Sequence, residues 1–157
     1  MADSSASPST HVLIVEARFY EKIADELVNG AMRELKKQGA TWERLAVPGA
    51  FEVPAAIRFA ADAARTPEGK PPFHGFLALG CVIRGETTHY DYVCGESARG
   101  LQDLAVHRGL AIGYGILTVE NEEQAWARAG LHRGDKGGDV ARACLAMVGI
   151  KRQFGLA

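Results

Sequence analysis

The feature that most constrains the fold is a regular alternation of short apolar runs with amphipathic segments. Four apolar runs are typical of buried strands: His11–Ala17, Trp42–Val47, Phe76–Ile83 and Leu110–Val119. Five segments have the spacing of helices: Glu21–Gln38, Val53–Arg65, Asp91–Arg108, Glu122–Ala129 and Gly138–Arg152. Strands that alternate with helices predict a three-layer α/β/α sandwich around a four-stranded parallel sheet.

Residues that commonly begin or end helices lie where this α/β pattern requires them. Gly39 and Gly109 follow expected helices, and Asn121 is a good N-cap for the helix after it. We expect residues 1–10 to form a flexible tail, Thr66–Gly75 to form a Pro/Gly-rich surface loop, and residues 11–157 to form a single domain. A length of 157 residues suits one domain.

Composition excludes several classes of protein. The 18 basic and 19 acidic residues leave a net charge of −1, so we expect no nucleic-acid partner. A hydrophobic share of 47% excludes disordered and fibrous chains. No run approaches about 18 consecutive apolar residues, so we expect no membrane-spanning segment. Three cysteines without Cys-x-x-Cys spacing indicate reduced thiols and a cytoplasmic location.

Ligands of parallel sheets bind beyond the carboxyl ends of the strands, so the residues there are the candidate site. Phe19 and Tyr20 follow the first run, where they could stack on a planar ligand or simply pack against a helix. After the second run, Ala50 offers an approachable backbone N–H, and Phe51 could cover an apolar ring. Glu52 could accept hydrogen bonds from sugar hydroxyls or stabilise a helix dipole.

The third run leads into the most informative segment, GCVIRGETTH. The backbone N–H groups of Glu86 and Thr87 could form an anion cradle, and His89 could transfer protons near neutral pH. The alternative is an ordinary surface histidine in the first turn of a helix. Arg128, on a helix, and Lys136, in an expected mobile glycine-rich loop, could contact phosphate or be solvated surface charges.

The sequence lacks the motifs of several common kinds of catalytic and cofactor-binding site. The five histidines are scattered, without metal-ligand spacing. Neither a dinucleotide-binding fingerprint after a strand nor a Gly-x-Ser-x-Gly elbow occurs. The motifs therefore argue against a metalloenzyme, a dinucleotide enzyme and a serine hydrolase, and we expect no metal site.

Taken together, these segments resemble the lumazine synthases. The resemblance rests on six stretches in the family's order: Arg18-Phe19, PGAFEVP at 48–54, GCVIRGETTHYDYV at 80–93, GILTVE at 115–120, EQAWARAG at 123–130, and Lys136-Gly137. It implies a flavodoxin-like fold and a transferase of riboflavin biosynthesis. That enzyme condenses 5-amino-6-(D-ribitylamino)uracil with 3,4-dihydroxy-2-butanone 4-phosphate. The products are 6,7-dimethyl-8-ribityllumazine, inorganic phosphate and two waters, and no cofactor takes part.

The resemblance also implies a role for each matching residue. His89 is the acid/base residue, Phe19 stacks on the pyrimidine, and the ribityl chain meets Ala50, Phe51 and Glu52. Cys81, Val82 and Ile83 present their backbone to the edge of the heterocycle. Glu86 and Thr87 bind the phosphate through main-chain N–H groups. Arg128 supplies charge to the phosphate from an adjacent subunit, and Tyr114 also belongs to that neighbour. Lys136 adds positive potential near the phosphate.

The chain departs from the family's pattern in ways that bear on assembly. Tyr114 stands where phenylalanine is usual, and Tyr20 where asparagine is common. The family forms homopentamers, some of which close into shells of sixty subunits. The long 66–75 loop, Leu131 and Asp135 favour a free pentamer. Two other classes stay open: a module that binds a lumazine or flavin without turnover, and a structural shell protein.

Overall fold

The computed structural model of the chain describes residues 9–63 and 72–157. Four strands are present in the described residues: β1 (His11–Ala17), β2 (Thr41–Val47), β3 (Gly75–Ile83) and β4 (Ile112–Val119). The helices are α1 (Glu21–Lys37), the 3-10 turn η1 (Ala50–Glu52), α2 (Val53–Asp62), α3 (His89–Arg108), α4 (Glu122–Ala129) and α5 (Lys136–Gln153). Residues 1–8 of the expected tail and 66–71 of the expected loop lie outside the described residues.

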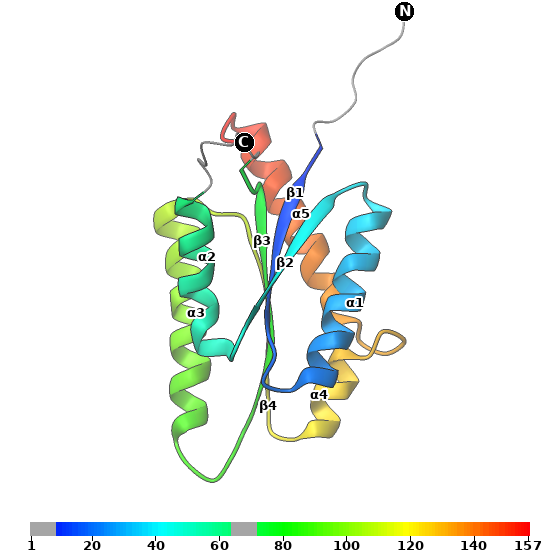
Figure 1. The fold of residues 1–157 in the computed structure, drawn as a ribbon, viewed down its shortest axis with the longest axis vertical. Coiled ribbons are helices and arrows are strands. Elements are labelled where there is room, and N and C mark those ends of the chain that lie inside the picture. The colour runs from blue at the N-terminus through cyan, green and yellow to red at the C-terminus, as the bar shows by residue number, and fades with distance from the viewer. Residues whose placement is uncertain (1–8, 64–71) are drawn as a thin grey trace, which may run out of the picture.

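The strands form one parallel sheet in the order β2-β1-β3-β4. Helices α2 and α3 cover one face, and α1, α4 and α5 cover the other, so the predicted three-layer sandwich is confirmed (Figure 1). After β2 the chain returns across β1 to form β3. The strand order therefore reverses between β1 and β3, which is the place where sheets of this kind bind their ligands.

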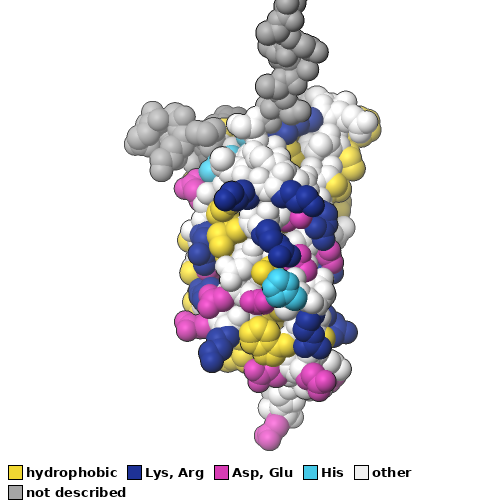
Figure 2. All heavy atoms as spheres, turned by 90° about the vertical axis from the view of Figure 1, so that its right-hand side faces the viewer, with side chains coloured by type: hydrophobic (Ala, Val, Ile, Leu, Met, Phe, Trp, Pro, Cys, Tyr) yellow, Lys and Arg dark blue, Asp and Glu magenta, His cyan; other side chains and the backbone are white. Residues whose placement is uncertain are grey.

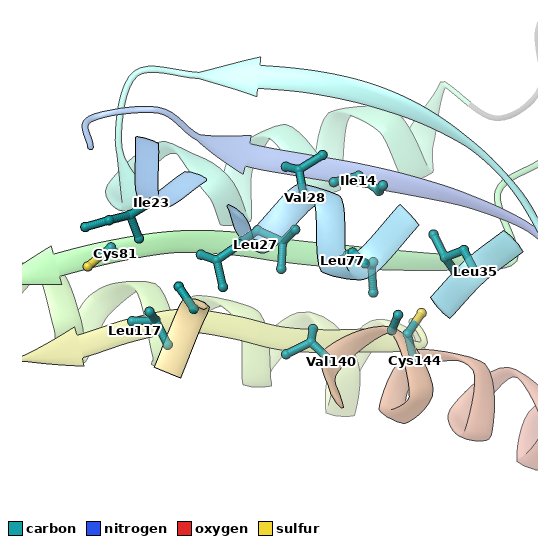
Figure 3. Packing of buried hydrophobic residues seen from close by; sticks show 14 of the residues in the cluster. Ile14, Ile23, Leu27, Val28, Leu35, Leu77, Cys81, Leu117, Val140 and Cys144 are labelled. Atoms are coloured by element: carbon teal, nitrogen blue, oxygen red, sulfur yellow. The ribbon is translucent and has the colours of Figure 1, made fainter. Parts of the chain in front are cut away.

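Side chains of successive strand residues point to opposite faces, and both faces are apolar. On β1, Val12 and Ile14 belong to the cluster beneath α1 and α5, while Leu13 and Val15 belong to the cluster beneath α2 and α3. Figure 3 shows Leu27 of α1 packed over the sheet in the first cluster. Burying one such side chain stabilises the fold by roughly 1.5–3 kcal/mol, which explains the continuous apolar strand runs.

Helix α5 begins earlier than the sequence indicates. Lys136 is its first residue, so the expectation of a loop at this position is wrong. Asp135 caps the helix by accepting from the backbone N–H of Gly138 at 3.3 Å. Gly137 is buried, and a Cβ there would collide with the carbonyl oxygen of Leu27 on α1. The glycines therefore serve close helix packing, which outweighs their low helix propensity.

Other boundaries differ by a few residues. Helix α3 starts at His89, two residues before the expected Asp91, and β4 starts at Ile112 instead of Leu110. Gly109 ends α3 in the left-handed conformation with φ 65°, which favours glycine. The 3-10 turn at Ala50–Glu52 was not expected.

Charges of both signs are mixed over the face of the molecule that carries α1 and α4. Figure 2 shows basic and acidic side chains side by side there. Ion pairs such as Arg142–Glu34 and Arg142–Asp139 are part of this pattern. The two signs of charge are thus interspersed on this face.

Candidate active site

A cleft of about 500 Å³ opens at the carboxyl edge of the sheet, at the point where the strand order reverses. Its lining comes from the loops after β1 and β2, from the end of β3 and from the start of α3. The lining residues are Phe19, Tyr20, Pro48, Gly49, Ala50, Phe51, Glu52, Cys81, Val82, Ile83, His89 and Val93. Eight of the thirteen residues predicted for the site therefore meet in one cleft.

An aromatic pair forms one wall of this cleft. The ring of Phe19 contacts that of Tyr20 edge-on, with centroids 4.9 Å apart and planes inclined by 72°. Tyr20 packs against the core beneath α1, and burial raises the pKa of its phenol. Phe19, in contrast, is 73% exposed. Of the two interpretations of this segment, simple packing thus suits Tyr20, while Phe19 keeps a free surface for a planar ligand.

The segment after β2 supplies both an apolar and an acidic side chain. Ala50 is buried, whereas Phe51 is 57% exposed. Glu52 precedes α2 but makes no side-chain capping hydrogen bond. Stabilisation of the helix dipole needs no such bond, so the position of Glu52 at the start of α2 leaves both interpretations of this residue open. Its carboxylate lies in the wall of the cleft, where it can accept hydrogen bonds from hydroxyl groups.

The end of β3 forms the floor of the cleft. Val82 and Ile83 are paired with Thr118 and Val119 of β4, so their backbone is held rigidly by the sheet. Burial raises the pKa of the Cys81 thiol to about 12. This thiol is therefore protonated at neutral pH and has little nucleophilic character. The segment can therefore offer a ligand its backbone groups and apolar side chains, but no reactive thiolate.

The turn between β3 and α3 places the remaining residues predicted near a phosphate. Glu86 and Thr87 are exposed in this turn, close to His89 in the chain but outside the cleft lining. The hydroxyl of Thr87 accepts from the backbone N–H of His89 at 3.3 Å. His89 itself lines the cleft, and among the described residues none forms a hydrogen bond with its ring. Its imidazole is thus available to a ligand.

Arg84, the first residue of this turn, links it to the end of the sheet and to α3. Its guanidinium donates to Glu120, directly after β4, with a distance of 2.7 Å. It also lies 3.6 Å from the carboxylate of Asp91 and 4.3 Å from the ring centroid of Tyr90, both on α3. The turn therefore has a defined shape, although its side chains are exposed.

Three predicted residues lie away from the cleft. Tyr114 is on β4 and lines a second, smaller hollow against α3. Arg128 is exposed on α4, where it donates to the carbonyl of Gln124 at 3.0 Å, and Lys136 is exposed at the start of α5. None of these three residues belongs to the lining of the cleft that contains His89.

Sequence reasoning missed Val93 as a lining residue. Val93 is buried and lies one helical turn after His89, so both residues face the cleft from α3. The signal was available, because an apolar residue four positions after a helical site residue shares its face.

Neither a metal site nor a membrane-spanning helix is present in the described part of the chain. Within residues 9–63 and 72–157, His, Cys, Asp and Glu side chains form no group of three that could hold a metal ion. Among these same residues, no helix has the length and apolar character needed to cross a membrane.

Fold and cleft together define a flavodoxin-like α/β protein with a cleft at the carboxyl edge of its sheet, the place where sheets of this class bind small molecules. Comparison with known proteins gives the family. A family profile described as 6,7-dimethyl-8-ribityllumazine synthase matches residues 9–152. The chain belongs to the 6,7-dimethyl-8-ribityllumazine synthase family, as the sequence motifs indicated.

Curated relatives support this assignment over almost the whole chain. A protein of Rhizobium meliloti (strain 1021), 6,7-dimethyl-8-ribityllumazine synthase 1, is 57% identical over 145 residues, which are 92% of this chain and 94% of the relative. A synthase of Bartonella tribocorum is 55% identical, with 92% of each chain covered. A synthase of Afipia carboxidovorans is 52% identical over 97% of this chain and 92% of its own length.

Proposed function

We propose that this chain condenses 5-amino-6-(D-ribitylamino)uracil with 3,4-dihydroxy-2-butanone 4-phosphate to give 6,7-dimethyl-8-ribityllumazine, the penultimate step of riboflavin biosynthesis. The observation that carries the proposal is the composition of the cleft. Phe19, Glu52 and His89 come from three different strand ends and line one space of about 500 Å³. An aromatic ring, a carboxylate and an imidazole suit a substrate that combines a heterocycle, a polyol and amino groups that must lose protons.

The two ends of the pyrimidine substrate match different parts of the lining. The heterocycle stacks on the exposed ring of Phe19 and meets the backbone of Cys81, Val82 and Ile83. The ribityl chain lies against Ala50, Phe51 and Glu52, where backbone N–H groups and a carboxylate can bind its hydroxyls. The floor formed by β3 is rigid, so it can hold the ring in one orientation.

The four-carbon phosphate binds at the turn before α3. Backbone N–H groups of Glu86 and Thr87 bind its phosphate, a mode that exposed turns before helices allow. His89 then moves protons at three points. The 5-amino group condenses with the ketone and releases water, the phosphate is eliminated, and the ribitylamino nitrogen closes the second ring with loss of another water. No cofactor is needed.

Placement supplies most of the catalysis in this scheme. Two substrates held side by side react with effective molarities of up to ~10⁵–10⁸ M in well-oriented systems. Each individual side chain then contributes a modest share of the rate.

We further propose a homopentamer whose active sites lie between subunits. Tyr114 and Arg128 of one chain complete the cleft of the next, and Lys136 adds positive potential near the phosphate. Two observations support this. β4 is at the edge of the sheet, and Tyr114 on it is 43% exposed. Phe19 and Phe51 also expose much apolar surface in a cleft that a neighbour could cover. We favour the free pentamer, and sedimentation distinguishes five copies from sixty.

The working unit in this proposal is the single domain of residues 11–157 in a reducing, cytoplasmic setting. Cys81, Cys94 and Cys144 are all free thiols, which supports such a compartment.

The decisive assay mixes both substrates with the purified protein and follows the absorbance of the lumazine product. Product that forms in proportion to enzyme concentration supports the synthase. Tight binding of the ribitylaminouracil without product would favour the alternative, a lumazine- or flavin-binding module.

A further inference from the structure

Glu16 is a buried acidic residue for which the proposed mechanism has no use. It is the next-to-last residue of β1 and is 3% exposed, on the face of the sheet that α1 covers. Among the described residues, the only other buried carboxylate is that of Glu34. A charge removed from water needs close partners of opposite charge, so the contacts of Glu16 reveal what it holds.

Two arginines share the Glu16 carboxylate. Arg44 of β2 donates from Nε to Oε2 at 2.8 Å and from Nη2 to Oε1 at 2.7 Å. Arg18 donates from Nη1 to Oε1 at 2.9 Å. The two-pronged contact with Arg44 already neutralises the carboxylate. The contact with Arg18 therefore needs a further explanation.

Arg18 connects Glu16 with the start of α1. Its Nη2 atom donates to the carboxylate of Asp25 at 2.5 Å and to the carbonyl of Glu21 at 3.4 Å. Its backbone N–H donates to the carbonyl of Val47 at 3.1 Å. Arg18 is thus held at both its backbone and its guanidinium, by strands on one side and a helix on the other.

The residue fixed in this way is the direct neighbour of Phe19. On the other side of Phe19, the carbonyl of Tyr20 accepts from the N–H of Ala24 in α1. The Phe19 ring itself is mostly exposed and touches the ring of Tyr20. Its position therefore depends on a backbone that Arg18 anchors on one side and Tyr20 on the other.

We propose that Glu16 and Arg18 are positioning residues for the heterocycle-binding end of the site. Glu16 fixes the guanidinium of Arg18, and Arg18 fixes the backbone that holds the Phe19 ring in the cleft. This inference rests on the proposed function, because it assigns the ring of Phe19 to the pyrimidine substrate. It predicts an effect on one substrate and not on the other.

The test compares Glu16→Gln with Glu34→Gln. Both replacements neutralise a buried carboxylate that is paired with arginine, since Glu34 accepts from Arg142 at 2.9 Å. Glu34 lies on α1 roughly 20 Å along the helix axis from Glu21, so it is remote from the cleft. Glu16→Gln should raise the KM for the ribitylaminouracil by about two- to tenfold, the range expected when an aromatic stacking contact is misplaced. The KM for the butanone phosphate should stay within twofold, and Glu34→Gln should change neither constant.

A second variant and a binding measurement keep the test decisive. Arg18→Lys keeps the charge but loses the planar fork that reaches Glu16 and Asp25 together, so it should give the same selective rise. If Glu16→Gln does not fold, the KM values of Arg18→Lys alone test the positioning role. Calorimetric titration with the ribitylaminouracil alone should show the same loss of affinity.

Equal changes in both KM values, or no change in the ribitylaminouracil constants, would overturn the positioning role. If the unaltered protein binds the ribitylaminouracil but makes no product, the proposed function fails, and the calorimetric comparison still tests the positioning role. If the unaltered protein does not bind it at all, both proposals fail.

Discussion

Phe19 and His89 line the same cleft, although Phe19 follows β1 and His89 begins α3. The two residues come together because β1 and β3 are neighbouring parallel strands whose carboxyl ends share one edge of the sheet. An aromatic surface therefore lies beside a proton-transfer group in a space large enough for two small substrates. Such an arrangement favours catalysis by orientation of the two substrates.

His89→Ala should lower kcat without abolishing it. Because placement of the two substrates supplies most of the rate, we expect a loss of about 10- to 100-fold, at or below the low end of the usual range for general acid–base groups. Steady-state kinetics with both substrates measures it. His107→Ala, on the exposed last turn of the same helix, is the control and should keep full activity. Complete inactivity of a folded His89→Ala protein that still binds substrate would contradict the orientation argument.

Cys81→Ala should leave kcat within about twofold of the unaltered enzyme. The pKa of the Cys81 thiol is raised to about 12 by burial, so the protonated thiol takes no part in nucleophilic or acid–base steps at neutral pH. Loss of the buried sulfur should cost about 1 kcal/mol in the free energy of unfolding. Cys144→Ala, buried in the core and absent from the cleft lining, should match it in stability and activity. A drop of more than tenfold for Cys81→Ala alone would assign the thiol a chemical role.

His74 should make the fold less stable in mild acid. Its Nδ1 accepts from the backbone N–H of His11 at 3.0 Å, which requires an unprotonated nitrogen. Burial lowers the pKa of His74, and the nearby charges of Arg152 and His11 lower it further. The unfolded chain therefore takes up this proton first. The contribution of His74 is complete above its ordinary pKa and is lost as pH falls through the lower pKa of the folded protein.

Denaturant unfolding between about pH 7.5 and pH 5.5 measures this contribution. His74→Asn keeps an acceptor for the His11 N–H but removes the titrating group, so its stability should fall less over that range. The exposed His107→Asn should follow the unaltered protein. Identical pH profiles for His74→Asn and the unaltered protein would show that His74 does not titrate in the way proposed here.

The sheet and most of the cleft could be predicted from local patterns. β1 and α4 have the predicted bounds, because a β-branched run and an Asn-capped amphipathic segment are strong local signals. The glycines around Lys136 led to the wrong prediction of a loop, because glycine has low helix propensity. Only the tertiary contact between Gly137 and Leu27 explains why a helix there is stable.

The proposed roles of Tyr114 and Arg128 in the active site could not be predicted from local sequence patterns. Spacing along the chain indicates which residues share an edge or a face of one subunit. It carries no information about the surface of a neighbour. Resemblance to the family supplied their roles, and the structure of one chain places them away from His89. Their assignment to an adjacent subunit is therefore the central claim to test.

Subunit complementation tests that claim most directly. Chains carrying His89→Ala and chains carrying Arg128→Ala are each expected to be weakly active alone. If an active site combines His89 of one chain with Arg128 of the next, random mixed assembly restores about a quarter of the sites. Co-expressed or co-refolded chains should then show kcat above either parent, at about that fraction of the unaltered enzyme or higher. Activity equal to the average of the two parents would contradict a shared site and place all of the catalytic groups within one chain.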